Sequence, residues 1–331
     1  MQHLAGTIIS QNGLGLAGFT NPGLQLPDEE IFKVLKSALA AGVTLWNGAD
    51  FYGTPDNNSL HLMNRYFAAY PEDADKVVLC IKSGLKSLGT FSMDCSPAGL
   101  RGFVDNALKI LGGKKKLDIF GCARVDPAVP VEESIRALAE FKKEGKIGGI
   151  QLSEVRAETI RRAAAVEKID MVEAEISLWA TDVFENGVAE VCGELGIVLV
   201  AHTPLGGGML TGQIKSLDDM PAHDYHRHFP RWQPENFAKN RLLVEELENF
   251  AKRKGCTTSQ LALSWIKSQN QKQGMPYLVP IAGTKSEARL LENIRDLHLT
   301  DEDQKELNTV LEKYPVAGAR YPPAGAKLAE Y

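Results

Sequence analysis

The chain has 331 residues, of which 44% are apolar and 24% charged, and its formal net charge is −5. This composition suits a globular protein with a large core. The mild acidity argues against a nucleic-acid-binding or membrane-binding protein, since both need a concentrated basic surface. The five cysteines are widely spaced and form no Cys-x-x-Cys pair, which favours reduced thiols in a cytoplasmic protein. We find no secretory signal pattern and no apolar run long enough to span a bilayer.

Short runs of β-branched and aliphatic residues alternate along the chain with longer amphipathic segments. The short runs are typical of strands covered on both faces and lie at residues 13–17, 43–47, 76–82, 117–122, 147–152, 171–175, 197–202 and 277–281. Apolar residues three and four apart predict helices over 28–41, 97–111, 131–143, 158–165, 184–195, 259–267 and 286–294. About eight such repeats imply parallel strands with right-handed crossovers. We therefore predict an α/β protein, a (β/α)8 TIM barrel that occupies residues 1–331 as a single domain.

Two segments depart from this alternation. Residues 205–240, after the seventh strand, form a long loop rich in glycine and then in proline and aromatic residues, and such loops lie on the catalytic face of a barrel. The C-terminal tail carries a short helix over 302–313 and then three prolines, and it either lies across the barrel mouth or hangs free. His223, His226 and His228 in the loop have no cysteines nearby, so we expect no metal site.

A lysine and a tyrosine stand out by their place relative to the predicted strands. Lys82 closes an apolar strand, where a charge is costly unless it is paired or functional, and Tyr52 follows the end of the preceding strand. Neighbouring barrel strands bring their carboxyl ends together, so Lys82 can meet Tyr52. An ammonium stabilises a nearby phenolate, which makes tyrosine a usable proton donor near neutral pH. Alternatively, Lys82 extends to solvent and Tyr52 caps a loop, and the spacing does not separate the two interpretations.

Residues 279–293 combine a strand end, a tight turn and a helix start. Backbone amides at a helix start bind phosphate, and Lys285 and Arg289 would add positive charge. An ordinary strand–helix turn explains the same residues equally well. The glycines at 206–208, shortly after His202, are also compatible with phosphate, but glycine-rich loops of this kind are weak signals.

Taken together, five stretches resemble the aldo-keto reductases over nearly the whole chain. They are residues 13–15, 46–53, 117–126, 145–154 and 280–293. Each stretch is weak alone, but their order and spacing are specific jointly. Residues 122–127 and 152–155 are most similar to the fungal pyridoxal reductase branch. The resemblance implies a (β/α)8 barrel that binds NADPH at its C-terminal face and acts on a small-molecule carbonyl substrate.

The family's catalytic set is Asp, Tyr, Lys and His, and this chain keeps part of it. The resemblance places the tyrosine at Tyr52 and the lysine at Lys82, whereas the aspartate falls on Asn47 and the histidine on Ala123. Because Asn47 is uncharged and offers only hydrogen bonds, we expect Lys82 to be less firmly protonated than beside a carboxylate. Loss of the histidine removes a donor to the substrate carbonyl and opens room for a bulkier or aromatic aldehyde. Arg124 would supply a donor if it faced inward, although neighbours on a strand point opposite ways.

The resemblance also implies a cofactor site. Ser153 and Glu173 match contacts to the nicotinamide amide, with glutamate where glutamine is usual, and His202 matches the ring that packs on the nicotinamide. The other matched positions lie in the glycine-rich turns and at the phosphate end: Gly15, Leu205, Gly207, Leu210, Gly283, Lys285, Ser286, Arg289 and Asn293. The two cations among them favour NADP over NAD, because a 2′-phosphate is stabilised by positive charge.

These expectations combine into one leading function and two alternatives. The leading function is NADPH-dependent reduction of an aldehyde or ketone, with pyridoxal as the foremost substrate, Tyr52 as the proton donor, and Trp179, Arg124 and Tyr321 lining the substrate pocket. The first alternative is an NADP-binding protein with weak or altered catalysis, because the family Asp and His are replaced. The second is a barrel lyase or isomerase in which Lys82 forms a Schiff base.

Overall fold

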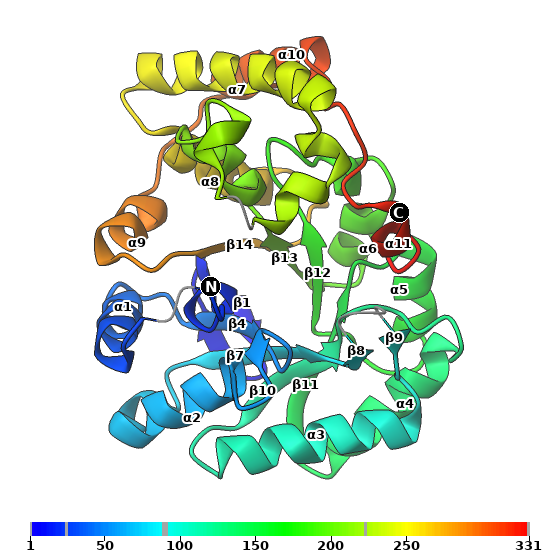
Figure 1. Ribbon diagram of the computed structural model, residues 1–331. Coiled ribbons are helices and arrows are strands. Elements are labelled where there is room, and N and C mark those ends of the chain that lie inside the picture. Colours follow the sequence, from blue (N-terminus) through cyan, green and yellow to red (C-terminus); the bar gives the residue numbers. More distant parts are fainter. Residues whose placement is uncertain (1, 24–25, 88–91, 222–223, 330–331) are drawn as a thin grey trace.

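Eight parallel strands close into a barrel in the computed structural model, which describes residues 2–23, 26–87, 92–221 and 224–329 (Figure 1). In ring order the strands are β3 (Gly13–Gly15), β4 (Leu45–Ala49), β7 (Val78–Ser83), β10 (Leu117–Cys122), β11 (Ile147–Ser153), β12 (Met171–Glu175), β13 (Val198–His202) and β14 (Leu278–Gly283). The predicted strands agree with these to within about two residues at each end. The (β/α)8 prediction is confirmed. Whether residues 1–331 form a single domain stays a prediction.

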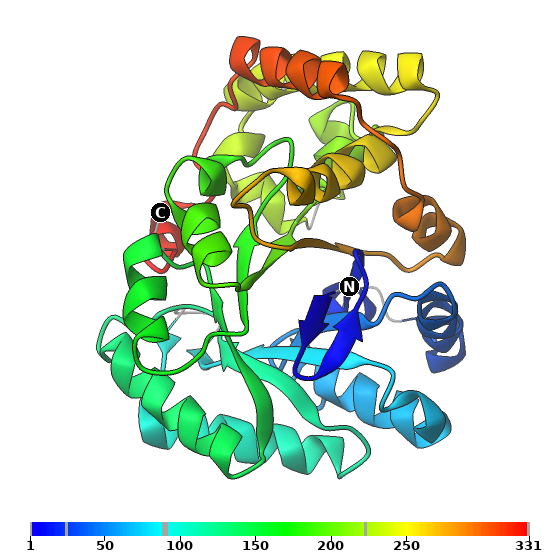
Figure 2. The same cartoon turned by 180° about the vertical axis from the view of Figure 1, so that it is seen from behind.

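Helices surround this ring (Figures 1 and 2). They are α1 (Asp28–Ala40), α2 (Ser59–Ala69), α3 (Pro97–Leu111), α4 (Val131–Lys143), α5 (Ala157–Ala164), α6 (Val188–Glu194), α7 (Pro234–Lys254), α8 (Thr258–Ser268), α9 (Glu287–Ile294), α10 (Asp301–Lys313) and α11 (Pro323–Ala326). Their ends follow from local chemistry: α3, for example, begins at the Ser96 side chain, which accepts from the Gly99 amide, and ends at left-handed Gly112. None of the described helices is both long enough and apolar enough to cross a membrane.

The structure corrects the predicted pattern in several regions, beginning with α2 (Ser59–Ala69), a helix that the sequence analysis did not predict. The helix predicted over 184–195 is divided by left-handed Gly187, so only Val188–Glu194 is α-helical. The long loop predicted over 205–240 ends earlier, because α7 begins at Pro234 after several 3₁₀ turns. Asn240 and Arg241 are buried on α7, and these polar residues interrupt the apolar spacing by which a helix is recognised.

An N-terminal hairpin, β1 (Gln2–Leu4) and β2 (Thr7–Ile9), closes one end of the barrel. Its residues Leu4 and Ile9 pack with the interior residues at the start of the strands, among them Leu45, Val78 and Ile119. Figure 2 shows this dark blue hairpin over the ring of strands. Polar side chains therefore meet at the opposite, carboxyl end, where barrel enzymes place their catalytic groups.

Candidate active site

The candidate catalytic side chains point into the barrel because strand residues alternate between its two faces. Asn47, Lys82 and Glu173 each lie two residues after an interior apolar residue of the same strand. They belong to β4, β7 and β12 and are almost fully buried, with 1–3% of each residue exposed. The strand period thus brings an amide, an ammonium and a carboxylate together at the carboxyl end.

The Lys82 ammonium donates to both neighbours. Its Nζ lies 2.6 Å from Asn47 Oδ1 and 2.9 Å from Glu173 Oε2, and Asn47 Nδ2 donates to the same glutamate oxygen at 2.8 Å. Burial alone would lower the pKa of Lys82, but the Glu173 carboxylate offsets this, aided by Tyr52, and the pKa lies above its ordinary value. The expectation that Lys82 is less firmly protonated is therefore wrong, because a carboxylate reaches it from β12.

Tyr52 lies beside this group, in the turn that follows β4. Lys82 Nζ is 5.2 Å from the centre of the Tyr52 ring, so the tyrosine and lysine predicted from sequence meet in the structure. The Thr20 hydroxyl donates to the Tyr52 carbonyl at 2.7 Å, which fixes the turn. Gly53 holds a φ of +121°, and a Cβ there would lie 2.2 Å from the Asn57 carbonyl oxygen. Only glycine fits directly after the tyrosine.

Asp50 is a half-buried carboxyl group near Tyr52 in the chain. It accepts a short hydrogen bond from the Ser83 hydroxyl through Oδ2, while Oδ1 is buried with no partner in the described part of the chain. Burial raises the pKa of Asp50 to about 6, against the smaller opposing effect of the Ser83 bond. Asp50 makes no contact with Lys82 that would let it replace Glu173.

Arg124 faces inward, because β10 has ended at Cys122 and the alternation of a strand no longer applies. Its guanidinium lies 3.5 Å from the Ser153 hydroxyl and 3.5 Å from the Tyr321 hydroxyl. Ser153 itself is 1% exposed at the end of β11. Arg124, Ser153 and Tyr321, predicted from different parts of the sequence, therefore lie together.

The C-terminal tail lies across the barrel mouth, which settles the two alternatives left by the sequence. Arg320 donates to Glu154 Oε2 at 2.9 Å and to Glu175 Oε2 at 3.1 Å. His202 Nε2 lies 2.6 Å from Glu154 Oε1. Burial raises the pKa of the Glu154 carboxyl, but His202 and the arginines reverse this and hold it well below its usual range. The pairing of Glu154 with Arg320 was not predicted from the sequence, because the two residues are far apart in the chain.

The predicted phosphate residues line a cavity of about 430 Å³. Leu205, Gly283, Lys285, Ser286, Arg289 and Asn293 contribute to its wall. Ser286 caps α9 by accepting from the Arg289 amide, so the helix start and two cations face the same space. Burial lowers the pKa of Lys285, an effect that a bound anion would oppose. The donors and charges of this cavity fit a phosphate group.

Of the remaining predicted cofactor positions, Gly15 and Gly283 pair in register on β3 and β14, where a Cβ at Gly15 would lie 3.0 Å from the Ile281 carbonyl. Gly207 has a φ of +64° in the turn after β13, and Leu210 is fully buried beneath that turn. His202 ends β13 on the interior side, two residues after Val200. These residues follow the rim from β3 to β13.

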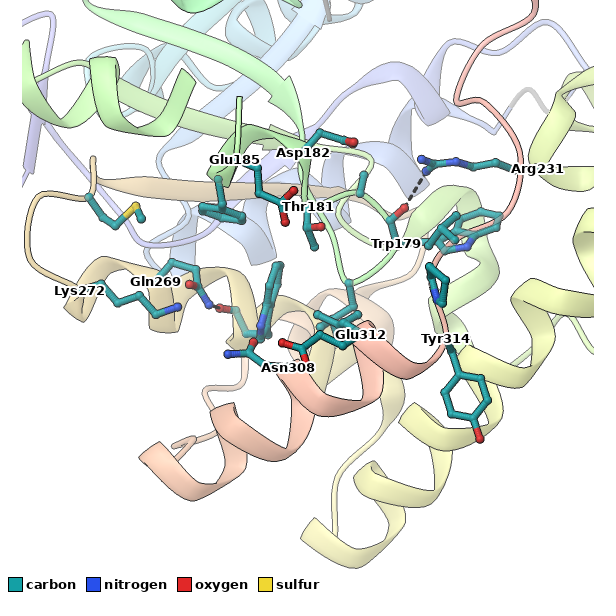
Figure 3. Close-up of a pocket in the computed structure, with 18 residues that line it drawn as sticks. Trp179, Thr181, Asp182, Glu185, Arg231, Gln269, Lys272, Asn308, Glu312 and Tyr314 are labelled. Atoms are coloured by element: carbon teal, nitrogen blue, oxygen red, sulfur yellow. Dashed lines mark hydrogen bonds between the residues drawn. The ribbon is translucent and has the colours of Figure 1, made fainter. Parts of the chain in front are cut away.

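A second cavity, of about 500 Å³, lies behind Trp179 and holds neither Tyr52 nor Lys82 (Figure 3). Arg231 donates to the Trp179 carbonyl at 2.6 Å, and the Trp179 ring packs edge-on against Trp232 at 5.2 Å. α10 contributes Asn308 and Glu312 to the far wall. Trp179 is therefore buried between this cavity and the turn at Gly206, and its predicted place in the substrate pocket stays a prediction.

Among the described residues, no three His, Cys, Asp or Glu side chains lie close enough together to hold a metal ion. His226 bonds Asp224 through Nδ1 at 2.8 Å and stacks on Tyr225. His223 lies outside the described residues.

The sequence matches the family model described as Aldo/keto reductase family over residues 13–312. The chain belongs to the aldo/keto reductase family. "Probable pyridoxal reductase 2" of Schizosaccharomyces pombe is 36% identical to it over 316 residues, which cover 93% of each chain. "Aldo-keto reductase" of Gibberella moniliformis is 34% identical over 93% of this chain and 92% of its own. The similarity to fungal pyridoxal reductases expected from sequence is thereby confirmed.

Solved aldo/keto reductases share the fold. A glycerol dehydrogenase from Gluconobacter oxydans superposes with a TM-score of 0.81 at 22% identity, covering 95% of this chain and 94% of that chain. A thermostable aldo-keto reductase solved with the inhibitor epalrestat gives a TM-score of 0.68 at 23% identity, covering 93% and 98%. As a family member, this aldo/keto reductase is an NAD(P)-dependent oxidoreductase that acts on carbonyl and alcohol groups.

Proposed function

We propose that this enzyme uses NADPH to reduce an aromatic aldehyde of the pyridoxal class to its alcohol. The observation that carries the proposal is the contact of Tyr52 with the buried Lys82 ammonium at the carboxyl end of the barrel. A phenol beside a fixed cation in a water-poor site can release its proton at the moment of reaction.

The reaction divides between the cofactor and three side chains. When bound, the reduced nicotinamide supplies the hydride that reaches the carbonyl carbon. Tyr52 donates its hydroxyl proton to the carbonyl oxygen. The Lys82 ammonium stabilises the phenolate that remains, and Asn47 orients that ammonium through its 2.6 Å hydrogen bond.

The preference for NADPH rests on the cavity at α9. Lys285 and Arg289 flank the capped helix start there, and both would neutralise a 2′-phosphate that NADH lacks. Ser153, Glu173 and His202 would hold the nicotinamide end near Lys82.

The substrate class rests on the name of the S. pombe relative and on the side chains at the mouth. The Arg124 guanidinium and the Tyr321 ring, 5.8 Å apart, offer a planar cation and an aromatic face. Both stack well on a flat ring that carries an oxygen substituent. Ala123 leaves room beside them.

The ion pair between Lys82 and Glu173 disfavours a Schiff-base reaction. Such a reaction needs Lys82 as a neutral amine, whereas the pairing with Glu173 stabilises the ammonium. The remaining alternative, an NADP-binding protein with weak catalysis, is motivated by the apolar Ala123, which cannot donate to a carbonyl oxygen.

The test follows NADPH absorbance in the presence of pyridoxal and of a nitrobenzaldehyde. We expect turnover that Tyr52→Phe lowers by about 100-fold or more, with NADPH binding unchanged. Tyr70→Phe is the control, since Tyr70 caps the end of α2 and its ring packs against Phe32 and Lys36 of the outer helix α1. NADPH binding without turnover of any aldehyde would favour the weak-catalysis alternative, and full activity of Tyr52→Phe would refute the assigned role.

A further inference from the structure

Among the described residues the Lys82 ammonium has two hydrogen-bond partners, and only one of them is charged. Glu173 is a carboxylate on β12, whereas Asn47 is a neutral amide on β4. β10 and β11 separate β12 from β7, the strand of Lys82, so Glu173 reaches Lys82 across the barrel interior. The charge that balances the lysine therefore comes from a strand that is not its neighbour.

The hydrogen bonds among Asn47, Lys82 and Glu173 require a particular donor or acceptor at each position. Asn47 accepts from Lys82 through Oδ1 and donates to Glu173 through Nδ2. An aspartate at position 47 could accept from Lys82 but could not donate, and it would repel Glu173 at 2.8 Å. An asparagine at 47 is thus the appropriate partner of a glutamate at 173, and a glutamine at 173 would suit an aspartate at 47.

We propose that Glu173 is the positioning residue that keeps Lys82 charged beside Tyr52, and that positions 47 and 173 form an exchanged pair in which carboxylate and amide have traded places. The inference rests on the proposed function for its role in turnover. The two departures from the family pattern, at 47 and at 173, then constitute one compensated change rather than two losses.

Burial makes the pair indispensable to the site. The Lys82 and Glu173 side chains are 3% and 2% exposed, so neither ion can exchange its partner for bulk water. Other groups face them as well: Tyr52 from the turn after β4, Cys80 from β7, Arg124 after β10 and His202 from β13. Of these groups, none is a carboxylate.

The activity arm compares Glu173→Gln with the double variant Asn47→Asp/Glu173→Gln. The single variant leaves a buried ammonium with two amides, so we expect kcat to fall by about tenfold or more and the basic limb of the pH–rate profile to move to lower pH. The double variant restores one carboxylate to Lys82, and we expect it to recover most of kcat and the original basic limb.

The second arm measures the titration of Lys82 itself by NMR of ¹⁵N-labelled lysine, with Lys82→Met to assign the signal. We expect the pKa of Lys82 to fall by about one unit or more in Glu173→Gln and to return in the double variant. Glu175→Gln is the matched control, because Glu175 lies on the same strand and pairs with Arg320 instead. It should leave the Lys82 titration in place.

This arm separates the inference from the proposed function, since it needs no substrate. An unchanged Lys82 titration in Glu173→Gln would overturn the inference whether or not the enzyme turns over. If the pKa of Lys82 falls in Glu173→Gln but does not return in the double variant, then positions 47 and 173 are not an exchanged carboxylate–amide pair. Absence of turnover in the wild-type enzyme, with the expected titrations, would refute only the proposed function.

Discussion

Arg320 and Glu154 lie 2.9 Å apart and join the C-terminal tail to the end of β11. The Arg320 side chain is 9% exposed and the Glu154 side chain is completely buried, in a residue whose φ is +56°. The pair holds the tail over the site at a point where the backbone is itself strained. This contact, the Asp50 carboxyl group, the cations at α9 and the turn at Gly53 each lead to a testable prediction.

Arg320→Met should lower the free energy of unfolding by about 3 kcal/mol, because it leaves Glu154 buried with less positive charge around it. Urea unfolding at pH 7.5 measures this. Arg161→Met is the control, since Arg161 forms an exposed pair with Glu194 on the surface, and it should cost less than about 1 kcal/mol. Equal losses in the two variants would contradict the buried role of Arg320.

Asp50→Asn should stabilise the protein at neutral pH. Because the pKa of Asp50 rises from 3.8 to about 6 on folding, the folded state keeps its proton longer, and stability declines as pH rises between those values. Asparagine avoids the buried charge, so at pH 7.5 we expect a gain of about 1–2 kcal/mol, and at pH 4 almost none. Unfolding curves from pH 4 to 8 test this. Asp75→Asn, at an exposed carboxylate, should show no such trend, and a loss of stability in Asp50→Asn at pH 7.5 would contradict the prediction.

Lys285→Met and Arg289→Met should each weaken NADPH binding by about 10- to 100-fold, the value of a charge-assisted contact to phosphate. NADH has no 2′-phosphate, so its dissociation constant should hardly change. Fluorescence titration with both dinucleotides measures the ratio. A parallel loss for NADH would place these cations elsewhere than at the 2′-phosphate.

Gly53→Ala should lower both stability and kcat, because the new Cβ would collide with the Asn57 carbonyl and displace the turn that carries Tyr52. Gly42→Ala is a matched control: Gly42 also has a positive φ, but a Cβ there meets no atom within 4 Å. We expect the control to cost about 1 kcal/mol and to leave kcat intact. Thermal unfolding and steady-state rates on the same samples decide the matter.

The sequence predicted the barrel well because each strand is a local pattern. Residues 117–122 and 171–175, for instance, are short runs of mostly aliphatic or aromatic character, and the strands have the predicted bounds. α7 was not predicted as a helix. Asn240, one of the polar residues that interrupt its apolar spacing, is buried for a tertiary reason, since its amide donates to the Arg231 and Ala317 carbonyls.

The candidate site, like the fold, could be predicted from the sequence only in part. Tyr52 follows β4 and Lys82 lies on the neighbouring strand β7, so their meeting could be predicted from strand order. Glu173 reaches Lys82 from across the ring, a contact that exists only once the barrel has closed. The signal was nonetheless present, since an amide at 47 and a carboxylate at 173 complement each other around one lysine.

The hairpin of residues 2–9 affects where substrate enters and product leaves. Because Leu4 and Ile9 pack into the base of the barrel, we expect reactants to enter and leave at the opposite, carboxyl end, where Arg320 is anchored. Under the proposed function, the product alcohol would leave past the same C-terminal segment that the aldehyde passed on entry. The residence time of the product then depends on how readily that segment detaches, which links the speed of the enzyme to a contact remote from any bond being made or broken.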